Sequence, residues 1–452
     1  MSELEEYAQQ IESLAQRLGL DYYPVDFEMA PASLMTEIAV YGLPVRMPHW
    51  SFGVRYIHQL VRQSMGHSKI FEVMFPGDPC RAFLMDGNST AENALVTAHV
   101  LGHADFSKNN QLFARFHAMA GGNIVETAAA HAHRIQLAIE AHGVERVESV
   151  LDAALALEAH IDIGGELHRV RYPEFIAKTP AATPNAFQSR FQQLPGAEER
   201  AAPQTGLVRA PVPPHPEYDL LWFIANYAPE LEQWERDIFL MVRAESFYFY
   251  PVFACQIMNE GWASYWHARL LREADFLPQP LYLSALKAHS DVVRPFASGR
   301  ETALAINPYH LGFTIWERIV EKHGIERARE VRRDEDDFGF VRNWLDEELA
   351  AEAGLFVYET RPGDEIRVAT KDINAIREAI LAPKFNFGSP RVAAAELKHD
   401  GSLSLAHDHA SDGRGLDVSR AKRVLDYVHR VWRRPVRLAT VNERSEAVEL
   451  AA

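Results

Sequence analysis

Two histidines four residues apart, His99 and His103, are the residues of this sequence best placed to do chemistry. If the alanine-rich segment around them is helical, both imidazoles lie on one face, where they can bind a single metal ion. Glu92 precedes His99 by seven residues, or two helical turns on the same side. It could be a third ligand, but the sequence STAE that begins at Ser89 also has the pattern of a capping box. The pattern therefore predicts a helix start and leaves two roles open for Glu92.

A second pair of residues repeats this spacing far along the chain. Glu260 and His267 are also seven residues apart, within the segment MNEGWASYWHARL. Two inward-facing helices that each carry a carboxylate and an imidazole can build a mixed nitrogen and oxygen site for zinc, iron or manganese. Each pair taken alone also fits side chains that are satisfied inside a helical core. We predict that the two helices converge on one metal ion, with the ligands His99, His103, Glu260 and His267.

Glu245 is a further candidate for acid or base chemistry. It opens an aromatic run, SFYFYPVFACQIM, that leads into the second helix through Pro251. Proline should kink the chain here, and we expect the kink to lie beside the site. Glu245 could therefore act as a general base, as could Glu92, and an ion pair with Arg236 or Arg243 is the alternative role for Glu245.

Other histidines and tyrosines have weaker claims. His131 and His133 are two residues apart, so on a helix they point to different sides and cannot hold one ion together. Tyr309 stands at an expected helix start and could reach a pocket, although a simple cap also explains this position. His407 and His409 project from one face of an expected strand, where they could bind a metal or an anion or mark an exposed strand end.

Length, charge and cysteine content exclude several classes of protein. A chain of 452 residues is long for one core, and a net charge of -16 makes nucleic acid an unsuitable partner for most of the surface. Cys80 and Cys255 are the only cysteines, which indicates a reducing compartment rather than a disulfide framework. The acidic amphipathic N-terminus lacks the features of a secretory signal, and no apolar run is long enough to insert in a membrane. We therefore expect a cytoplasmic protein.

Apolar periodicity predicts a mainly α (α+β) fold. A large helical N-terminal domain, residues 1–382, should contain a short β-hairpin at 69–75 and 81–85 and a second hairpin turn at Gly363-Asp364. A small α/β C-terminal domain, residues 383–452, should have the order β-β-α-β. Helices are expected over residues 3–18, 54–64, 88–110, 123–142, 145–160, 230–243, 258–270, 280–293, 307–323 and 340–353.

Two segments are expected to lie outside the packed core. Residues 172–217 hold nine of the 25 prolines with little apolar content between them, which is typical of an extended linker or a lid. Residues 332–337, RRDEDD, form a charge run that we interpret as a solvated linker or helix end. Phosphate-binding loops, dinucleotide fingerprints, nucleophile elbows and zinc-ribbon cysteines do not occur in the sequence. The histidine and glutamate constellation therefore carries the functional prediction.

Four stretches together resemble the stage V sporulation protein R (SpoVR-like) family. They are AHVLGHADFSKNN, MNEGWASYWHARL, INPYHLGF, and a C-terminal group of FNFGSPRV with LSLAHDH. The resemblance runs from about residue 5 to residue 440. It implies a helical domain followed by a small C-terminal domain, a cytoplasmic location, and a role in spore cortex formation or in stationary-phase and stress responses. It also implies two partners, a serine-kinase-like AAA ATPase and a von Willebrand-type protein.

A weaker similarity connects HVLGH with the HExxH helix of zinc peptidases. In those enzymes a glutamate beside the first histidine polarises the attacking water, whereas Val100 occupies that position here. A conventional peptidase mechanism is therefore not expected unless Glu92 or Glu245 supplies the base from another direction. Our leading hypothesis is a metal-dependent hydrolase. The alternative is a non-catalytic adaptor or regulator that acts with the ATPase and its partner.

Overall fold

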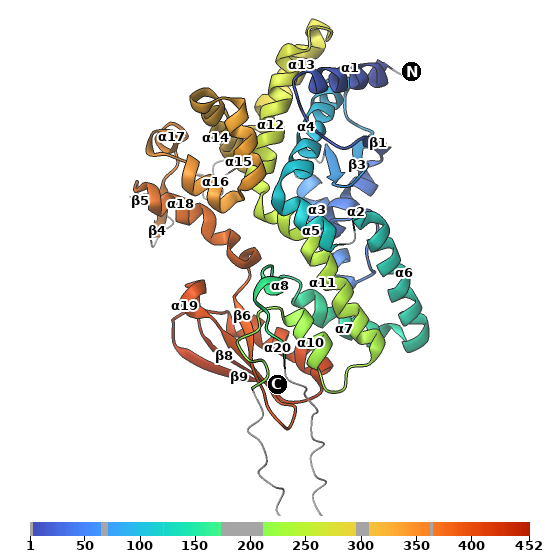
Figure 1. The fold of residues 1–452 in the computed structure, drawn as a ribbon, viewed down its shortest axis with the longest axis vertical. Helices are drawn as coiled ribbons and strands as arrows, with labels where there is room; N and C mark the ends of the chain where they lie inside the picture. Colours follow the sequence, from blue (N-terminus) through green and yellow to red (C-terminus); the bar gives the residue numbers. More distant parts are fainter. Residues whose placement is uncertain (1–2, 65–70, 121, 173–210, 295–306, 362–364) are drawn as a thin grey trace, which may run out of the picture. The chain divides into compact units, whose positions relative to one another are not determined.

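The computed structural model describes residues 3–64, 71–120, 122–172, 211–294, 307–361 and 365–452. These residues form a mainly helical fold with three small sheets (Figure 1), which confirms the predicted class. They group into two compact units, one made of residues 1–141 and 244–388, the other of residues 142–243 and 389–452. The predicted domain limits, 1–382 and 383–452, stay a prediction. The proposed linker or lid at 172–217 falls mostly on residues 173–210, which are outside the described residues.

The helices of the first unit include most of those predicted. The strands β4 (Val357–Arg361) and β5 (Glu365–Thr370) pair antiparallel, as predicted, and the turn predicted at Gly363-Asp364 lies outside the described residues. One predicted helix, 340–353, is divided into two short ones, α16 and α17. The helices are α1 (Glu3–Arg17), α2 (Ala32–Tyr41), α3 (Trp50–Ser64), α4 (Thr90–Asn109), α5 (Gln111–Met119), α6 (Ile124–His142), α12 (Gln256–Glu273), α13 (Gln279–Val292), α14 (Pro308–His323), α15 (Ile325–Asp334), α16 (Asp337–Trp344), α17 (Glu347–Glu352) and α18 (Ile373–Leu381).

A three-stranded sheet precedes α4 in this unit. The predicted hairpin is formed by β2 (Glu72–Phe75) and β3 (Cys80–Met85), which pair antiparallel. An additional strand, β1 (Val25–Ala30), pairs parallel to β3. The sequence analysis missed β1, although VDFEMA alternates apolar and polar residues, which is the usual signal of a half-buried strand. The sheet places Glu72 opposite Leu84, close to the start of α4.

The centre of the unit is α12, which packs against both α4 and α14 (Figure 1). Glycines make these contacts unusually close. A Cβ atom on Gly261 would lie 2.3 Å from the backbone of Gly312 on α14, and one on Gly102 of α4 would lie 2.7 Å from the Cα atom of Ala263. No side chain fits at such distances. The glycines therefore allow α4 and α14 to approach α12 backbone to backbone.

The helix before α12, α11 (Gln233–Ala254), contains Pro251, and the chain bends by 59° where α11 ends and α12 begins. The bend lies at Cys255, four residues after Pro251, whereas the chain stays helical through the proline itself. Among the described helices, none is by itself long and apolar enough to cross a membrane, although α11 and α12 taken together across their bend meet that test.

RRDEDD lies at a helix end, as predicted, because α15 ends at Asp334 and α16 begins at Asp337. It is solvated only in part: Arg333 and Asp334 are exposed, but the two ends of the run are not. Arg332 is 7% exposed and Asp337 is fully buried. Asp337 accepts hydrogen bonds from the amides of Ile257 and Met258, each at 2.9 Å, and pairs with Lys384 at 2.9 Å. The first amides of a helix lack partners within the helix, so α12, which starts abruptly after the bend, needs such an acceptor from outside. The first and last residues of the charge run, Arg332 and Asp337, are therefore buried, and Asp337 caps the start of α12.

The second unit contains the predicted β-β-α-β arrangement. Its four-stranded sheet has the order β6-β7-β8-β9, and β7 and β8 are parallel because α20 connects them. The fourth strand, β9, was not predicted. The elements are α7 (Val144–Ala156), α8 (Gly165–His168), α10 (Leu220–Tyr227), β6 (Val392–Leu397), β7 (Leu403–His407), α19 (His409–Asp412), α20 (Val418–Trp432), β8 (Val436–Val441) and β9 (Ala447–Ala451), together with the first part of α11.

One histidine of this unit gives a prediction about stability in acid. Burial lowers the pKa of His160 to about 4. This histidine is therefore protonated in the unfolded chain below about pH 6.5 but stays neutral in the folded protein until the pH approaches 4. The stabilisation is complete above about pH 6.5 and is lost as the pH falls towards 4. Between pH 7.5 and pH 5 the free energy of unfolding of the native protein should fall by about 1 to 2 kcal/mol more than that of a His160→Gln variant. Urea unfolding of both proteins at the two pH values measures this difference, and equal losses would contradict the prediction.

Candidate metal centre

Helix α4 presents the two histidines from inside the protein. Its start has the predicted capping box, because the Ser89 Oγ atom accepts from the Glu92 amide at 3.3 Å and the Glu92 carboxylate accepts from the Ser89 amide at 2.7 Å. The helix is rich in alanine and is buried on nearly all sides. His99 and His103 are only 4% and 7% exposed. Buried imidazoles need polar partners, and those partners come from other elements of the unit.

Helix α12 supplies the first of these partners. The Oε2 atom of Glu260 lies 3.5 Å from the Nε2 atom of His103 and 3.7 Å from the Nε2 atom of His99. The close approach of α4 to α12 at Gly102 brings these side chains together. Metal bonds of about 2.1 Å in a tetrahedral site separate neighbouring ligand atoms by about 3.4 Å. Both distances from the Oε2 atom are therefore close to those between the ligands of one metal ion.

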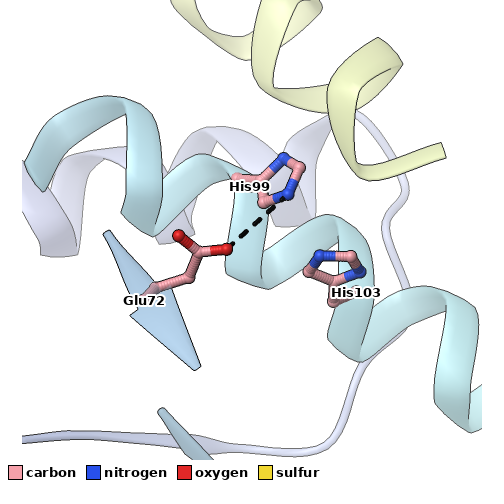
Figure 2. Close-up of side chains that lie close together, drawn as sticks. All are labelled: Glu72, His99 and His103. Atoms are coloured by element: carbon pink, nitrogen blue, oxygen red, sulfur yellow. Dashed lines mark ion pairs between the residues drawn. The ribbon is translucent and has the colours of Figure 1, made fainter. Parts of the chain in front are cut away.

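Strand β2 brings a second carboxylate, Glu72, to the same place (Figure 2). Its Oε1 atom is 3.9 Å from the Nε2 atom of His99. One ligand atom from each of Glu72, His99 and His103 can be chosen so that all lie within 4.8 Å of one another. Figure 2 shows the carboxylate of Glu72 pointing from the strand toward the ring of His99 on the helix. Glu72, His99 and His103 could thus hold one ion, and Glu260 approaches both imidazoles.

The other ring nitrogens are held by neighbouring side chains. The Nδ1 atom of His103 lies 2.8 Å from the Oδ1 atom of Asn259, so it donates and leaves Nε2 with a free lone pair. The Nδ1 atom of His99 lies 2.9 Å from Nδ1 of His267, whose Nε2 atom lies 2.6 Å from Nδ1 of His289. Such partners orient the imidazole ligands of metal sites. His267 is placed behind His99 with both of its nitrogens in use.

Burial and neighbouring charges shift the pKa values of the cluster. Burial raises the pKa of Glu72 to about 7, an effect that His99 partly opposes. Burial and the neighbouring His99 lower the pKa of His103 to about 4, so this ring is neutral at pH 7. Burial acts to raise the pKa of Glu260, but His103 and His99 outweigh it and hold the pKa below its usual value. Burial acts to lower the pKa of His99, but Glu260 and Glu72 outweigh it and raise this pKa above its usual value. A neutral imidazole and an ionised carboxylate are the forms that bind metals, and these are the forms favoured for His103 and Glu260.

A pocket of about 390 Å³ opens beside the cluster. Glu72, His99 and His267 lie in its wall, and apolar side chains make up much of the rest. Tyr309, at the start of α14, also lines it, and the nearby Glu260 carboxylate raises the pKa of its hydroxyl well above the usual range. The full lining is Phe71, Glu72, Glu92, Leu95, Val96, His99, His267, Ala288, Asp291, Val292, Asn307 and Tyr309. A small molecule could reach Glu72 and His99 through this pocket.

The other predicted site residues lie in different surroundings. Glu92 lines the pocket, but its carboxylate is held in the capping box. Glu245 is fully buried, where it pairs with Arg46 at 2.8 Å and with His131 at 3.0 Å. His407 is bound to Thr440 and Asp412 in the second unit. The structure therefore gathers His99, His103, Glu260 and His267 and does not bring Glu245 to the pocket wall.

Three residues of the arrangement were missed from the sequence. Glu72 was placed on a strand but was not recognised as a partner, although a lone acid in the apolar run IFEVMF is a usable signal. Asn259 adjoins Glu260 and could have been considered with it. His289 lies on α13 with no spacing that links it to the other helices. Only the packing of α13 against α4 and α12 reveals it.

Comparisons with known proteins agree with this picture. The family model described as SpoVR like protein matches residues 1–388, and the model of the SpoVR-like C-terminal domain matches residues 391–443. The chain is also 29% identical to the uncharacterized protein YcgB of Escherichia coli (strain K12), over 97% of this chain and 92% of that protein. No solved structure gives a significant match. Because the two family models cover nearly the whole chain, the protein belongs to the SpoVR-like family.

Proposed function

We propose that this protein is a metal-dependent hydrolase whose divalent ion is held by His99, His103 and Glu260. One observation carries the proposal. The Oε2 atom of Glu260 is buried and has no hydrogen-bond partner among the described residues, yet it lies between the Nε2 atoms of two histidines. A buried carboxylate oxygen without a partner costs free energy, and a cation bound by all three atoms removes that cost.

The donor set limits which ions would suit the site. Two imidazoles with one or two carboxylates are ligands for zinc, and equally for iron or manganese. A bound divalent ion would supply Lewis-acid chemistry and an acidified water. Cysteine is not among the candidate ligands in the described part of the chain. Cys80 and Cys255 are both buried, and neither belongs to the cluster. Zinc, iron and manganese therefore remain the ions to test.

Glu72 is the residue that we propose as the general base. It is in the pocket wall beside His99, and its pKa of about 7 suits proton exchange near neutral pH. Glu92 and Glu245 were the bases expected from the sequence. Their carboxylates already hold the Ser89 amide and the side chains of Arg46 and His131, respectively. Tyr309, whose ring stacks on that of His99 with a centroid distance of 6.1 Å, also lines the pocket and could donate a hydrogen bond to a substrate.

The biological setting of the proposal comes from the family resemblance. We place the activity in spore cortex formation or in a stationary-phase or stress response, in the cytoplasm. The proposed partners are the serine-kinase-like AAA ATPase and the von Willebrand-type protein. The resemblance names these processes and partners but no reaction, so the chemistry is argued from the metal centre alone.

Removal of the two histidines should abolish metal binding. Purified protein is expected to contain about one zinc, iron or manganese ion per chain, and a His99→Ala, His103→Ala double variant should contain none, because the remaining carboxylates cannot hold the ion alone. Elemental analysis of protein purified without chelators measures both. His117→Ala is the matched control, because this half-buried histidine lies outside the cluster on α5.

A different result would favour the alternative function. Native protein that stays free of metal after incubation with each of the three ions would rule out the hydrolase proposal. If that protein still binds the ATPase and the von Willebrand-type protein, the non-catalytic adaptor becomes the better account.

A further inference from the structure

Three imidazoles form a continuous hydrogen-bonded chain that leads away from the metal centre. His99 contacts His267 through their Nδ1 atoms at 2.9 Å, and His267 contacts Nδ1 of His289 through its Nε2 atom at 2.6 Å. His99 and His267 are buried, at 4% and 0% exposure, whereas His289 on α13 is only partly buried. The edge of Phe313 packs on the His289 ring, with a centroid distance of 5.4 Å. The chain thus joins a proposed ligand to a side chain near the surface.

The direction of donation along this chain follows from the position of the ion. The Nε2 atom of His99 faces Glu260 and Glu72, so a metal bound there uses the Nε2 lone pair, and the proton of the neutral ring must be on Nδ1. His99 then donates to Nδ1 of His267. A neutral His267 that accepts at Nδ1 carries its own proton on Nε2, and it must donate that proton to His289.

We propose that His289 is a positioning residue that fixes, through His267, the tautomer in which His99 can bind a metal ion. The inference rests on the metal centre proposed above and adds two residues to it. If His289 did not accept, His267 would have either a buried N–H without a partner or the opposite tautomer. In the opposite tautomer, His267 would donate to Nδ1 of His99 and move the proton of His99 to Nε2, where the metal should bind.

Two neutral replacements of His289 separate hydrogen bonding from packing. His289→Leu removes the acceptor, whereas His289→Gln offers a carbonyl oxygen at a similar reach. We expect the zinc dissociation constant of the leucine variant to rise by about 10-fold to 100-fold, as for other residues that orient a metal-bound histidine. The glutamine variant should stay close to the native protein. Competition with a chromogenic zinc chelator measures all three constants, and thermal unfolding confirms that each variant is folded.

Nitrogen-15 NMR of histidine-labelled, zinc-loaded native protein tests the tautomer directly. We expect His267 to be protonated on Nε2 and unprotonated on Nδ1, and the metal-free leucine variant to show the opposite form. Chemical shifts distinguish the two nitrogens. This readout on the native protein does not depend on whether a variant folds.

The outcomes separate this inference from the proposed function. If native protein does not bind zinc, iron or manganese, the metal centre and the role of His289 are both overturned. If it binds zinc but His267 carries its proton on Nδ1, or if the leucine variant binds zinc as tightly as native protein, the role of His289 is overturned while the metal centre stands.

Discussion

Replacing Gly261 by alanine is expected to lower the free energy of unfolding by at least about 3 kcal/mol. The added Cβ atom would lie 2.3 Å from the backbone of Gly312 and 2.7 Å from the amide nitrogen of Phe313. Neither contact involves a flexible side chain that could move aside, so α12 and α14 would have to separate. Because Glu260 precedes Gly261 directly, the separation should also displace Glu260 and weaken metal binding.

Gly53→Ala is the matched control for this substitution. Gly53 is also within a helix, α3, but no atom lies within 4 Å of the position that its Cβ atom would take. Alanine there should stabilise the protein by about 0.5 to 1 kcal/mol, since it favours the helix. Urea unfolding gives both values. If Gly261→Ala were as stable as the control, the close contact of the two helices would be refuted.

The sequence predicted the helices of the site because local patterns encode them. The capping box at Ser89 and the spacing of His99 and His103 depend only on neighbours within a few residues, and α4 forms as expected. The same holds for the hairpin before it. Convergence of α4 and α12 followed from two similar spacings. The structure brings His99, His103 and Glu260 together, whereas His267 lies behind His99 with both ring nitrogens bound to other histidines.

Features that depend on distant contacts were not predictable in this way. Glu72 joins the cluster only because β2 lies beside α4, and His289 only because α13 packs on α12. The charges of RRDEDD are typical of a solvated loop, but Arg332 and Asp337 are buried because α4 and α12 offer them partners. Composition describes what a residue prefers on average, whereas its partner decides where a charge can be buried.

Asp105 is another charged residue that is buried because its partners are, and its replacement should destabilise the protein strongly. It is 1% exposed and lies on α4, two residues after His103. Its carboxylate pairs with Arg332 of α15 and accepts hydrogen bonds from the Nε1 atom of Trp262 at 2.7 Å and from the Asp21 amide at 2.8 Å. One side chain thus ties α4 to α12, to α15 and to the segment that follows α1.

Asp105→Ala should destabilise the protein by about 3 to 5 kcal/mol, because it leaves the guanidinium of Arg332 buried without its carboxylate. The cost arises from the uncompensated charge, so adding Arg332→Met should recover a large part of it. Urea unfolding of the native protein, the two single variants and the double variant gives the coupling between the residues. A double variant no more stable than Asp105→Ala would show that the Trp262 and Asp21 hydrogen bonds, and not the buried charge, account for the loss. In that case α4 would be held in place mainly by its contact with α12, the same contact on which the metal centre depends.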